Sequence, residues 1–205
     1  MSDDFIFRGP VAELDPDLAR ILEREAARQA STIILIASES EAPDAVSETL
    51  ASAFSHIYAE GYPREESRKQ TQAEIMDLDL ELATYRRYSD PRYYKGVEYA
   101  DVLEALTRRR AAELFAANGI SADNLFVNVQ PLSGAPANSA VYTALLQPGD
   151  TILGLNLNDG GHLTHGSPVN RSGKVYKGVP YFVDAQTEVL DYDAIERLAL
   201  EHKPR

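Results

Sequence analysis

The chain has 205 residues, of which 44% are hydrophobic and 25% charged, with a formal net charge of -12. This composition is ordinary for a globular domain with a real core and argues against a disordered chain. The acidity disfavours nucleic acid as a partner, because a phosphate backbone would be repelled. No apolar stretch approaches the roughly 18 residues of a membrane span, and the absence of cysteine excludes disulfides and thiolate metal sites. We expect a cytoplasmic protein.

The first half of the chain is predicted to be helical. Asp15 and Pro16 are typical of an N-cap and a first helical position, so a helix is expected through residue 30. A short apolar run at 33–37 precedes a second helix, expected from Pro43 to about residue 54. Three later segments complete this half: a turn with two tyrosines and one carboxylate at 58–63, one amphipathic helix within 64–90, where glycine and proline are absent, and a helix over 101–117.

The second half changes to strands alternating with helices. Short apolar runs predict strands at 125–129 and 151–157 and one or two more within 175–183, with helices over 137–146 and 191–202. Such alternation favours an α/β fold with a largely parallel sheet.

Ser133-Gly134-Ala135 lies where a predicted strand gives way to a helix. Backbone N–H groups at a helix start can converge on an anion, and glycine lets that anion come close, so a phosphate is the natural guest. The alternative is a plain strand-to-helix turn, because short glycine motifs are weak signals.

The segment 159–170, DGGHLTHGSPVN, combines three glycines with two histidines. A metal site is not expected, since His162 and His165 lack a third and fourth ligand in a suitable pattern. The flanking glycines remove side chains from one face of the loop, which would leave an imidazole free to stack on a flat ligand. The ordinary alternative is hydrogen bonding of the imidazole to nearby backbone.

Taken together, these motifs resemble serine hydroxymethyltransferase. The resemblance covers residues from about 20 to 205 and is carried, in family order, by LIASE at 35–39, YAEGYP at 58–63, RYY at 92–94, EY at 98–99, VQP at 129–131 with SG at 133–134 and AN at 137–138, and GGHLTHGSPVN at 160–170. An aminotransferase or a threonine aldolase fits these motifs less well.

The resemblance implies a fold, a reaction and a partner. The fold would be the N-terminal half of a fold type I pyridoxal-phosphate large domain, with an incomplete, mainly parallel sheet and flanking helices. Residues 1–40 would form an N-terminal arm and helix, and residues 41–205 the incomplete large domain, with a helical insertion at about 65–91. The family interconverts serine and glycine with pyridoxal 5'-phosphate and tetrahydrofolate, as a dimer with shared active sites.

The resemblance also assigns roles to residues. Ser133, Gly134 and Ala135 match the phosphate cradle, and His162 matches the histidine that stacks on the cofactor ring. The remaining matches are Ser38 at the substrate carboxylate, Tyr58 near the cofactor phosphate, Glu60 in proton transfer, Tyr94 as a second active-site tyrosine, and Leu157 and Gly161 at the pterin of folate. Without the resemblance, Glu60 would be an ordinary solvated turn carboxylate.

The chain also departs from the family. Ala135 replaces a serine that would donate to the phosphate, a loss of about 1 kcal/mol. Leu132, Pro136, Asn158 and Asp159 replace His, Gln, Ala and His, and the charge of Asp159 is expected to weaken binding of a phosphorylated cofactor modestly. Between Pro63 and Arg92 the family has two residues and this chain twenty-eight. That insertion would cap the cleft, extend the dimer contact or form a surface excrescence.

The largest departure is the absence of a lysine in the family's Schiff-base setting, which such chemistry requires. The resemblance places that lysine, with an aspartate and an arginine, beyond residue 205, so this chain alone is expected to be inactive. One reading is the N-terminal portion of the enzyme, truncated or completed by a C-terminal half on a separate chain. The other is a non-catalytic homologue that acts as a dimerisation or regulatory partner of an intact enzyme.

Overall fold

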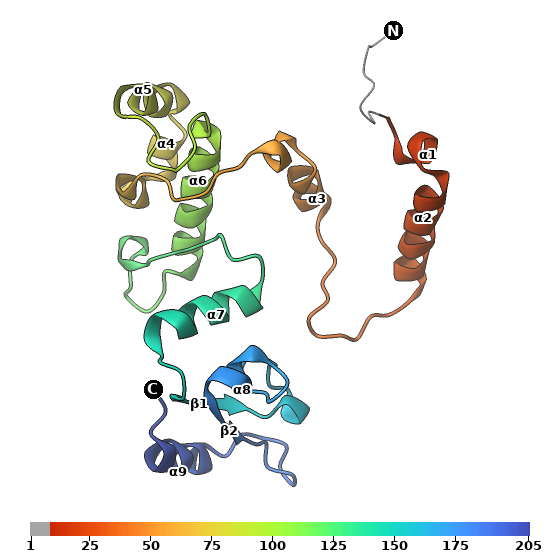
Figure 1. The fold of residues 1–205 in the computed structure, drawn as a ribbon, viewed down its shortest axis with the longest axis vertical. Coiled ribbons are helices and arrows are strands. Elements are labelled where there is room, and N and C mark those ends of the chain that lie inside the picture. Colours follow the sequence, from red (N-terminus) through yellow and green to blue (C-terminus); the bar gives the residue numbers. More distant parts are fainter. Residues whose placement is uncertain (1–8) are drawn as a thin grey trace. The chain divides into compact units, whose positions relative to one another are not determined.

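The computed structural model describes residues 9–205. The chain separates into two compact units, Met1–Tyr58 and Ala59–Arg205. Figure 1 shows the elements of each unit. Within the described residues, no helix is long and apolar enough to cross a membrane.

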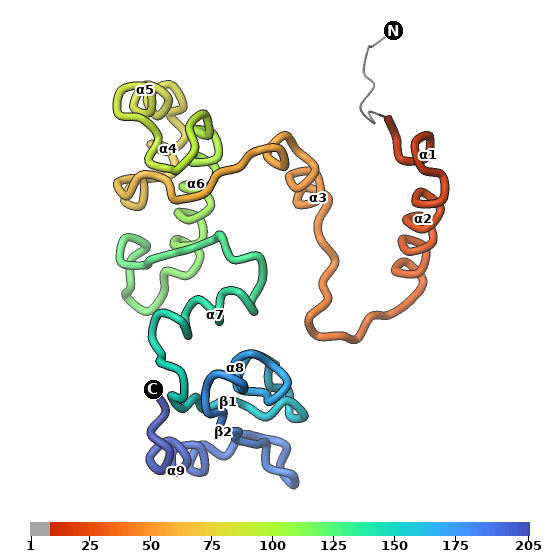
Figure 2. Tube along the Cα trace, in the orientation of Figure 1, coloured from red at the N-terminus to blue at the C-terminus, as the bar shows by residue number. Residues whose placement is uncertain are grey.

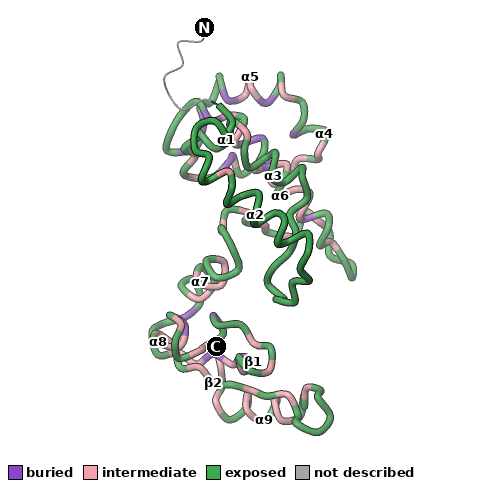
Figure 3. Tube along the Cα trace, turned by 90° about the vertical axis from the view of Figure 1, so that its right-hand side faces the viewer, coloured by how far each residue is buried: buried purple, intermediate pink, exposed green. Residues whose placement is uncertain are grey.

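The first unit contains helices but no buried core. Its elements are α1 (Val11–Leu14), α2 (Pro16–Ser31), α3 (Asp44–Leu50) and a 3-10 turn (Ala53–His56). The predicted start of α2 is confirmed, since the Asp15 carboxylate accepts a hydrogen bond from the Leu18 N–H at 3.0 Å. No residue from 9 to 58 is buried, and this part of the trace is coloured exposed almost throughout in Figure 3.

The helical part of the second unit has a small core of its own. A 3-10 turn (Glu65–Lys69), α4 (Gln72–Ile75) and α5 (Leu78–Tyr88) precede the long helix α6 (Glu98–Phe115). Ile75 of α4 is 1% exposed and packs with Val102 and Ala105 of α6, with Leu78 and Leu106 against them. The predicted periodicity therefore does mark a buried face.

The single helix predicted within 64–90 is wrong, because the segment forms three short elements. Thr71 caps α4 in a reciprocal capping box with Glu74. Asp77 caps α5, with its carboxylate accepting from the Leu80 N–H at 3.2 Å. Each cap satisfies the free N–H groups of a new helix start, so the chain restarts twice where periodicity alone suggests continuity.

A two-stranded parallel sheet forms the other part of the second unit. After α7 (Gly134–Leu145), β1 (Thr151–Leu155) pairs with β2 (Lys177–Tyr181) in the register Thr151↔Lys177 to Leu155↔Tyr181. Helices α8 (Arg171–Val175) and α9 (Tyr192–His202) contact β2, and the trace in Figure 2 can be followed through β1, the connecting loop, α8 and β2. The predicted α/β layout and parallel pairing are confirmed for these strands.

The strand predicted at 125–129 is wrong. The segment is extended but pairs with no other strand among residues 9–205, and Phe126 is 79% exposed. A strand needs a hydrogen-bonded neighbouring strand. The exposed ring of Phe126 contacts the Arg68 guanidinium, whose Cζ is 3.8 Å from the ring centre. In the 175–183 segment, β2 is followed by one antiparallel bridge between Val183 and Leu190.

Candidate functional site

The glycine-rich loop begins as β1 ends and folds back tightly on itself. The chain turns through a 3-10 turn (Leu157–Asp159) and Gly160, whose φ of 98° is in the left-handed region. The next residue, Gly161, donates its N–H to the Asn156 carbonyl at 2.9 Å. A Cβ at Gly161 would lie 1.9 Å from the Leu155 carbonyl oxygen, so no side chain fits there.

The loop then packs directly onto the two strands, backbone against backbone. A Cβ added to Gly154 of β1 would meet the His165 carbonyl oxygen at 2.6 Å, and one added to Gly178 of β2 would meet the Gly166 carbonyl oxygen at 2.5 Å. Two strand glycines therefore let the loop sit against the sheet. The glycines of this region have a structural use beyond clearing space for a ligand.

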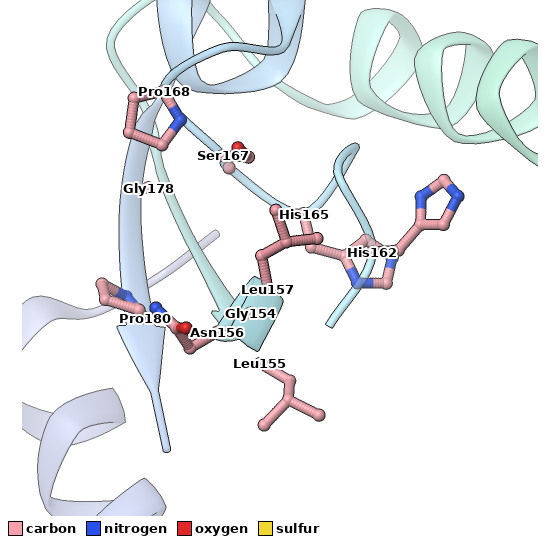
Figure 4. A pocket seen from close by; sticks show the side chains of 11 residues that line it. Gly154, Leu155, Asn156, Leu157, His162, His165, Ser167, Pro168, Gly178 and Pro180 are labelled. Atoms are coloured by element: carbon pink, nitrogen blue, oxygen red, sulfur yellow. The ribbon is translucent and has the colours of Figure 1, made fainter. Parts of the chain in front are cut away.

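A small pocket of about 190 Å³ opens between this loop and the ends of the strands. Figure 4 shows the two imidazole side chains, His162 and His165, beside one another at its edge. Their ring centres are 5.6 Å apart and the rings are tilted by 57°. Both histidines are exposed and both line the pocket. Leu157 lines the same pocket, and Gly161 shapes the turn beside it.

Hydrogen bonds connect His162 to α7. The Thr164 hydroxyl is 2.6 Å from His162 Nδ1 and accepts a hydrogen bond from the Asn138 side-chain amide at 2.7 Å. Asn138 lies four residues after Gly134, one turn into the helix. The structure therefore brings the imidazole and the beginning of α7 together, although Gly134 and His162 are 28 positions apart in the sequence.

The start of α7 is open to an anion. Ser133 is the N-cap, and its side chain makes no capping hydrogen bond within residues 9–205. The N–H groups of Gly134 and Ala135 belong to the first helical turn, which has no intrahelical acceptor for them. A Cβ on Gly134 would meet nothing within 4 Å, so the approach is clear. Pro136 has no N–H, which limits the cradle to two helical donors and the cap residue.

A second cluster surrounds Arg92 and holds the turn that carries Glu60. Arg92 is 3% exposed, and its Nη1 donates to the carbonyls of Ala59 at 2.6 Å and Gly61 at 3.0 Å. The Tyr93 N–H donates to the Glu60 carbonyl at 3.1 Å. Residues on either side of the predicted insertion are therefore in direct contact, which is what a looped-out insertion requires.

Two carboxylates balance the charge of Arg92. Its Nε donates to Asp101 and its Nη2 to Glu104, both at 2.6 Å. Asp101 is fully buried, and burial, reinforced by the neighbouring Asp90 carboxylate and opposed by Arg92, raises its pKa to about 7. Lys95 donates to the backbone carbonyls of Asp90 and Arg92. The cluster is an internal ionic network in which burial raises the pKa of Asp101.

Gln130 joins this network to the segment that leads into α7. Its side-chain amide donates to the Gly61 carbonyl at 2.7 Å and lies 3.0 and 3.1 Å from the two Glu104 oxygens. Because Gln130 is only three residues before Ser133, the Glu60 turn and the approach to α7 share one set of hydrogen bonds.

Three of the predicted site residues remain to be placed, namely Tyr94, Ser38 and Tyr58. Tyr94 follows Tyr93 and is 48% exposed. Ser38 and Tyr58 belong to the first unit, Ser38 at a turn closed by the Glu39 N–H and the Ile36 carbonyl at 3.0 Å. In the described part of the chain, no group of three or more histidine and acidic side chains could hold a metal ion.

Several residues of the candidate site carry weak sequence signals or none. Arg92 and Gln130 lie in matched motifs, yet the residues alone give no hint of which backbone oxygens they bind. Thr164 is a hydroxyl residue two positions after a histidine, a spacing that allows the local side-chain bond observed here. Asn138 could only be paired with Thr164 through the folded structure, because they are 26 positions apart in the sequence.

Comparison with known proteins gives one family. A family model described as serine hydroxymethyltransferase matches residues 11–89 and 82–205. Two curated relatives carry that name, one from Koribacter versatilis with 48% identity over 193 residues and one from Acinetobacter radioresistens with 45% over 195. These alignments cover 94% and 95% of this chain but only 38% and 39% of the relatives, so the chain corresponds to an N-terminal part.

Proposed function

Because the chain belongs to the serine hydroxymethyltransferase family, we propose that it supplies the cofactor-facing N-terminal part of that enzyme. The reaction would convert serine and tetrahydrofolate to glycine and methylenetetrahydrofolate. When bound, pyridoxal phosphate supplies an electron sink for bonds at the α-carbon of an amino acid. The role of this chain is to bind the cofactor and to position the groups around it.

The observation that carries this proposal is the hydrogen-bonded connection from α7 through Asn138 and Thr164 to His162. A phosphate at the N–H groups of Gly134 and Ala135 would meet the positive end of the helix dipole. The exposed His162 ring, tied to the next turn of the same helix, would lie against the flat ring of that molecule. Ser133 would add its hydroxyl. The residues present therefore fit a phosphorylated aromatic cofactor.

The remaining roles are assigned from the family. Glu60 would move a proton at the serine hydroxyl, and Tyr58 and Tyr94 would complete the site. Ser38 would bind the substrate carboxylate, while Leu157 and Gly161 would meet the pterin. Glu60 would be held in place only by a rigid turn. Arg92 and Gln130 both donate to the Gly61 carbonyl, and these two hydrogen bonds would make the turn rigid.

The lysine that holds the cofactor covalently would come from the part of the enzyme that this chain does not cover. The chain spans about 38% of the length of the relatives it matches, and none of its five lysines has the family's lysine setting. β1 has an edge that faces away from β2, where the Thr151 carbonyl accepts the Arg205 N–H at 3.0 Å. This edge is suited to pairing with a further strand. We propose completion by a C-terminal half or an intact homologue, in a dimer-based assembly.

The alternative proposal is a non-catalytic homologue that serves as a binding or regulatory partner. Two observations favour it. Pro136 removes one N–H from the first turn of α7, and the Asp159 carboxylate accepts a hydrogen bond from the Val183 N–H at 3.1 Å. Asp159 therefore has a structural role in this chain, and that role does not involve a cofactor.

A chimera tests the two proposals. The matched 38% of the Koribacter versatilis relative is replaced by this chain, so that the relative supplies the rest of the enzyme. The measurements are visible absorbance of bound pyridoxal phosphate after gel filtration and serine cleavage with tetrahydrofolate. The unmodified relative is the positive control, and a chimera with His162→Ala is the matched negative control.

Colour and turnover in the chimera, both reduced by His162→Ala, would support a catalytic N-terminal part. A folded chimera that stays colourless would contradict it. Restoring the family residues with Ala135→Ser, Pro136→Gln and Asp159→His separates the proposals further. Activity that returns only in the restored chimera would favour the non-catalytic homologue.

A further inference from the structure

The hydroxyl of Thr164 lies between two polar side chains from distant parts of the chain. Its Oγ1 is 2.6 Å from His162 Nδ1 and 2.7 Å from Asn138 Nδ2. Thr164 is 6% exposed, so this hydroxyl is largely shielded from water. A hydroxyl has one proton to donate and can give it to only one of two partners.

The backbone decides the direction of these bonds. The Thr164 N–H points at the same His162 Nδ1, at 3.2 Å. A backbone N–H can only donate, so Nδ1 has to present a lone pair. The hydroxyl then also donates to Nδ1, and its oxygen accepts from the Asn138 amide. In this arrangement of hydrogens the hydroxyl and the backbone N–H of Thr164 share the single lone pair of Nδ1, the hydroxyl at the shorter distance.

We propose that Thr164, oriented by Asn138, is a positioning residue that holds His162 as the neutral tautomer with its proton on Nε2. Two donors at Nδ1 also fix the plane of the ring against rotation. The Nε2–H lies on the opposite edge of the imidazole from the buried hydroxyl and is the single donor that the ring can offer. His162 itself is exposed, so this donor can be reached from the pocket.

This arrangement defines what the ring recognises. A neutral imidazole can stack on a flat aromatic ligand without adding a positive charge next to it. The fixed Nε2–H lies in the plane of the imidazole, so it favours a hydrogen-bond acceptor beside the stacked ring and disfavours a donor at that point. The inference rests on the proposed function only for the identity of the ligand, because the tautomer is a property of the chain alone.

The test uses nitrogen-15 labelled histidine in the full chain at pH 8, where imidazoles are ordinarily neutral. Long-range proton–nitrogen spectra report which ring nitrogen carries the proton, and a His162→Gln variant assigns the signals. His165, in the same loop, is the internal reference. The informative variants are Thr164→Val, Thr164→Ser and Asn138→Asp. A carboxylate at 138 can only accept, so it would draw the hydroxyl proton away from His162.

We expect an unprotonated Nδ1 in the unaltered chain and in Thr164→Ser. In Thr164→Val the backbone N–H remains as the single donor to Nδ1, so the His162 signals should shift only part of the way toward those of an imidazole with mixed tautomers, and in Asn138→Asp part of the proton should move to Nδ1. A protonated Nδ1 in the unaltered chain, or unchanged His162 signals in both Thr164→Val and Asn138→Asp, would overturn the inference. The spectra outside the loop show whether each variant is folded. Failure of the chimera to bind pyridoxal phosphate would overturn the proposed function and leave this result standing.

Discussion

Two parts of the second unit each hold a loop of the candidate site, and they do so in opposite ways. The Glu60 turn is fixed by charge, because a buried arginine donates to its backbone oxygens and is balanced by Asp101 and Glu104. The His162 loop is fixed by close backbone contact, which glycines at 154, 161 and 178 make possible. The Glu60 turn is held by ionisable side chains, so its stability should depend on pH. The His162 loop is held by contacts that only glycine permits, so its stability should fall when a side chain is added.

Removing the buried guanidinium should have the largest effect. Arg92→Met leaves Asp101 buried without its cation, and breaking such a pair costs about 3–5 kcal/mol of the free energy of unfolding. Arg109→Met is the matched control, because the partners of Arg109, Glu113 and Asp123, are more exposed and such pairs contribute about 1 kcal/mol or less. Urea unfolding measures both. Equal losses of the free energy of unfolding in the two variants would contradict the stabilising effect expected from the buried network.

Adding one methyl group to the loop should have the next largest effect. At Gly161→Ala the new Cβ would lie 1.9 Å from the Leu155 carbonyl oxygen, so the backbone has to move, at a cost of about 2–3 kcal/mol. At Gly160→Ala the same methyl meets nothing within 4 Å, and only the strain of its positive φ remains, about 1 kcal/mol. Thermal unfolding of the two variants separates the effect of the steric clash at 161 from that of the backbone strain at 160. A smaller loss at 161 than at 160 would contradict the packing described.

The charged cluster should make stability depend on pH. The pKa of Asp101 is raised to about 7 from an ordinary 3.8, so the folded chain binds more protons than the unfolded chain between these values. The free energy of unfolding should therefore fall as pH rises from about 4 to 7, by about 3 kcal/mol. Asp101→Asn cannot ionise and should flatten this slope. A slope that persists in the variant would assign it to other groups.

The smallest effect is expected at the start of α7. Gly134→Ala adds a methyl where nothing lies within 4 Å, and alanine favours a helix, so stability should change by about 0.5 kcal/mol or less. Binding of a phosphorylated ligand should weaken more than stability changes, because the methyl narrows the approach to the N–H groups. Calorimetric titration beside thermal unfolding measures the two. A change in stability larger than the change in binding would mean that Gly134 has a packing role.

Much of the fold follows from local signals in the sequence. The N-cap at Asp15 is predicted because neighbouring residues specify it, and the apolar runs at β1 and β2 are predicted correctly because each run finds the other as its partner. Periodicity predicted one helix where Thr71 and Asp77 start two, since caps override a continuous pattern. The run at 125–129 failed as a strand because strand formation depends on a distant partner that composition does not reveal.

The site was predicted less completely than the fold. The family motifs indicated Ser133 to Ala135 and His162, and the structure connects these two segments. The residues that connect them, Asn138 and Thr164, were missed because their contact spans 26 positions. The same holds for Arg92, whose partners include two backbone carbonyls more than 30 positions away.

The central claim is that one flat phosphorylated molecule contacts both the start of α7 and the His162 ring. Its most direct test is a titration of the labelled full chain with pyridoxine 5'-phosphate, which has no aldehyde to react with lysines, beside inorganic phosphate. The account predicts that pyridoxine phosphate shifts the Gly134 and Ala135 amide signals and the His162 ring signals with one shared Kd, while inorganic phosphate shifts only the amides. Shifts at one cluster alone, or two unrelated Kd values, would contradict it.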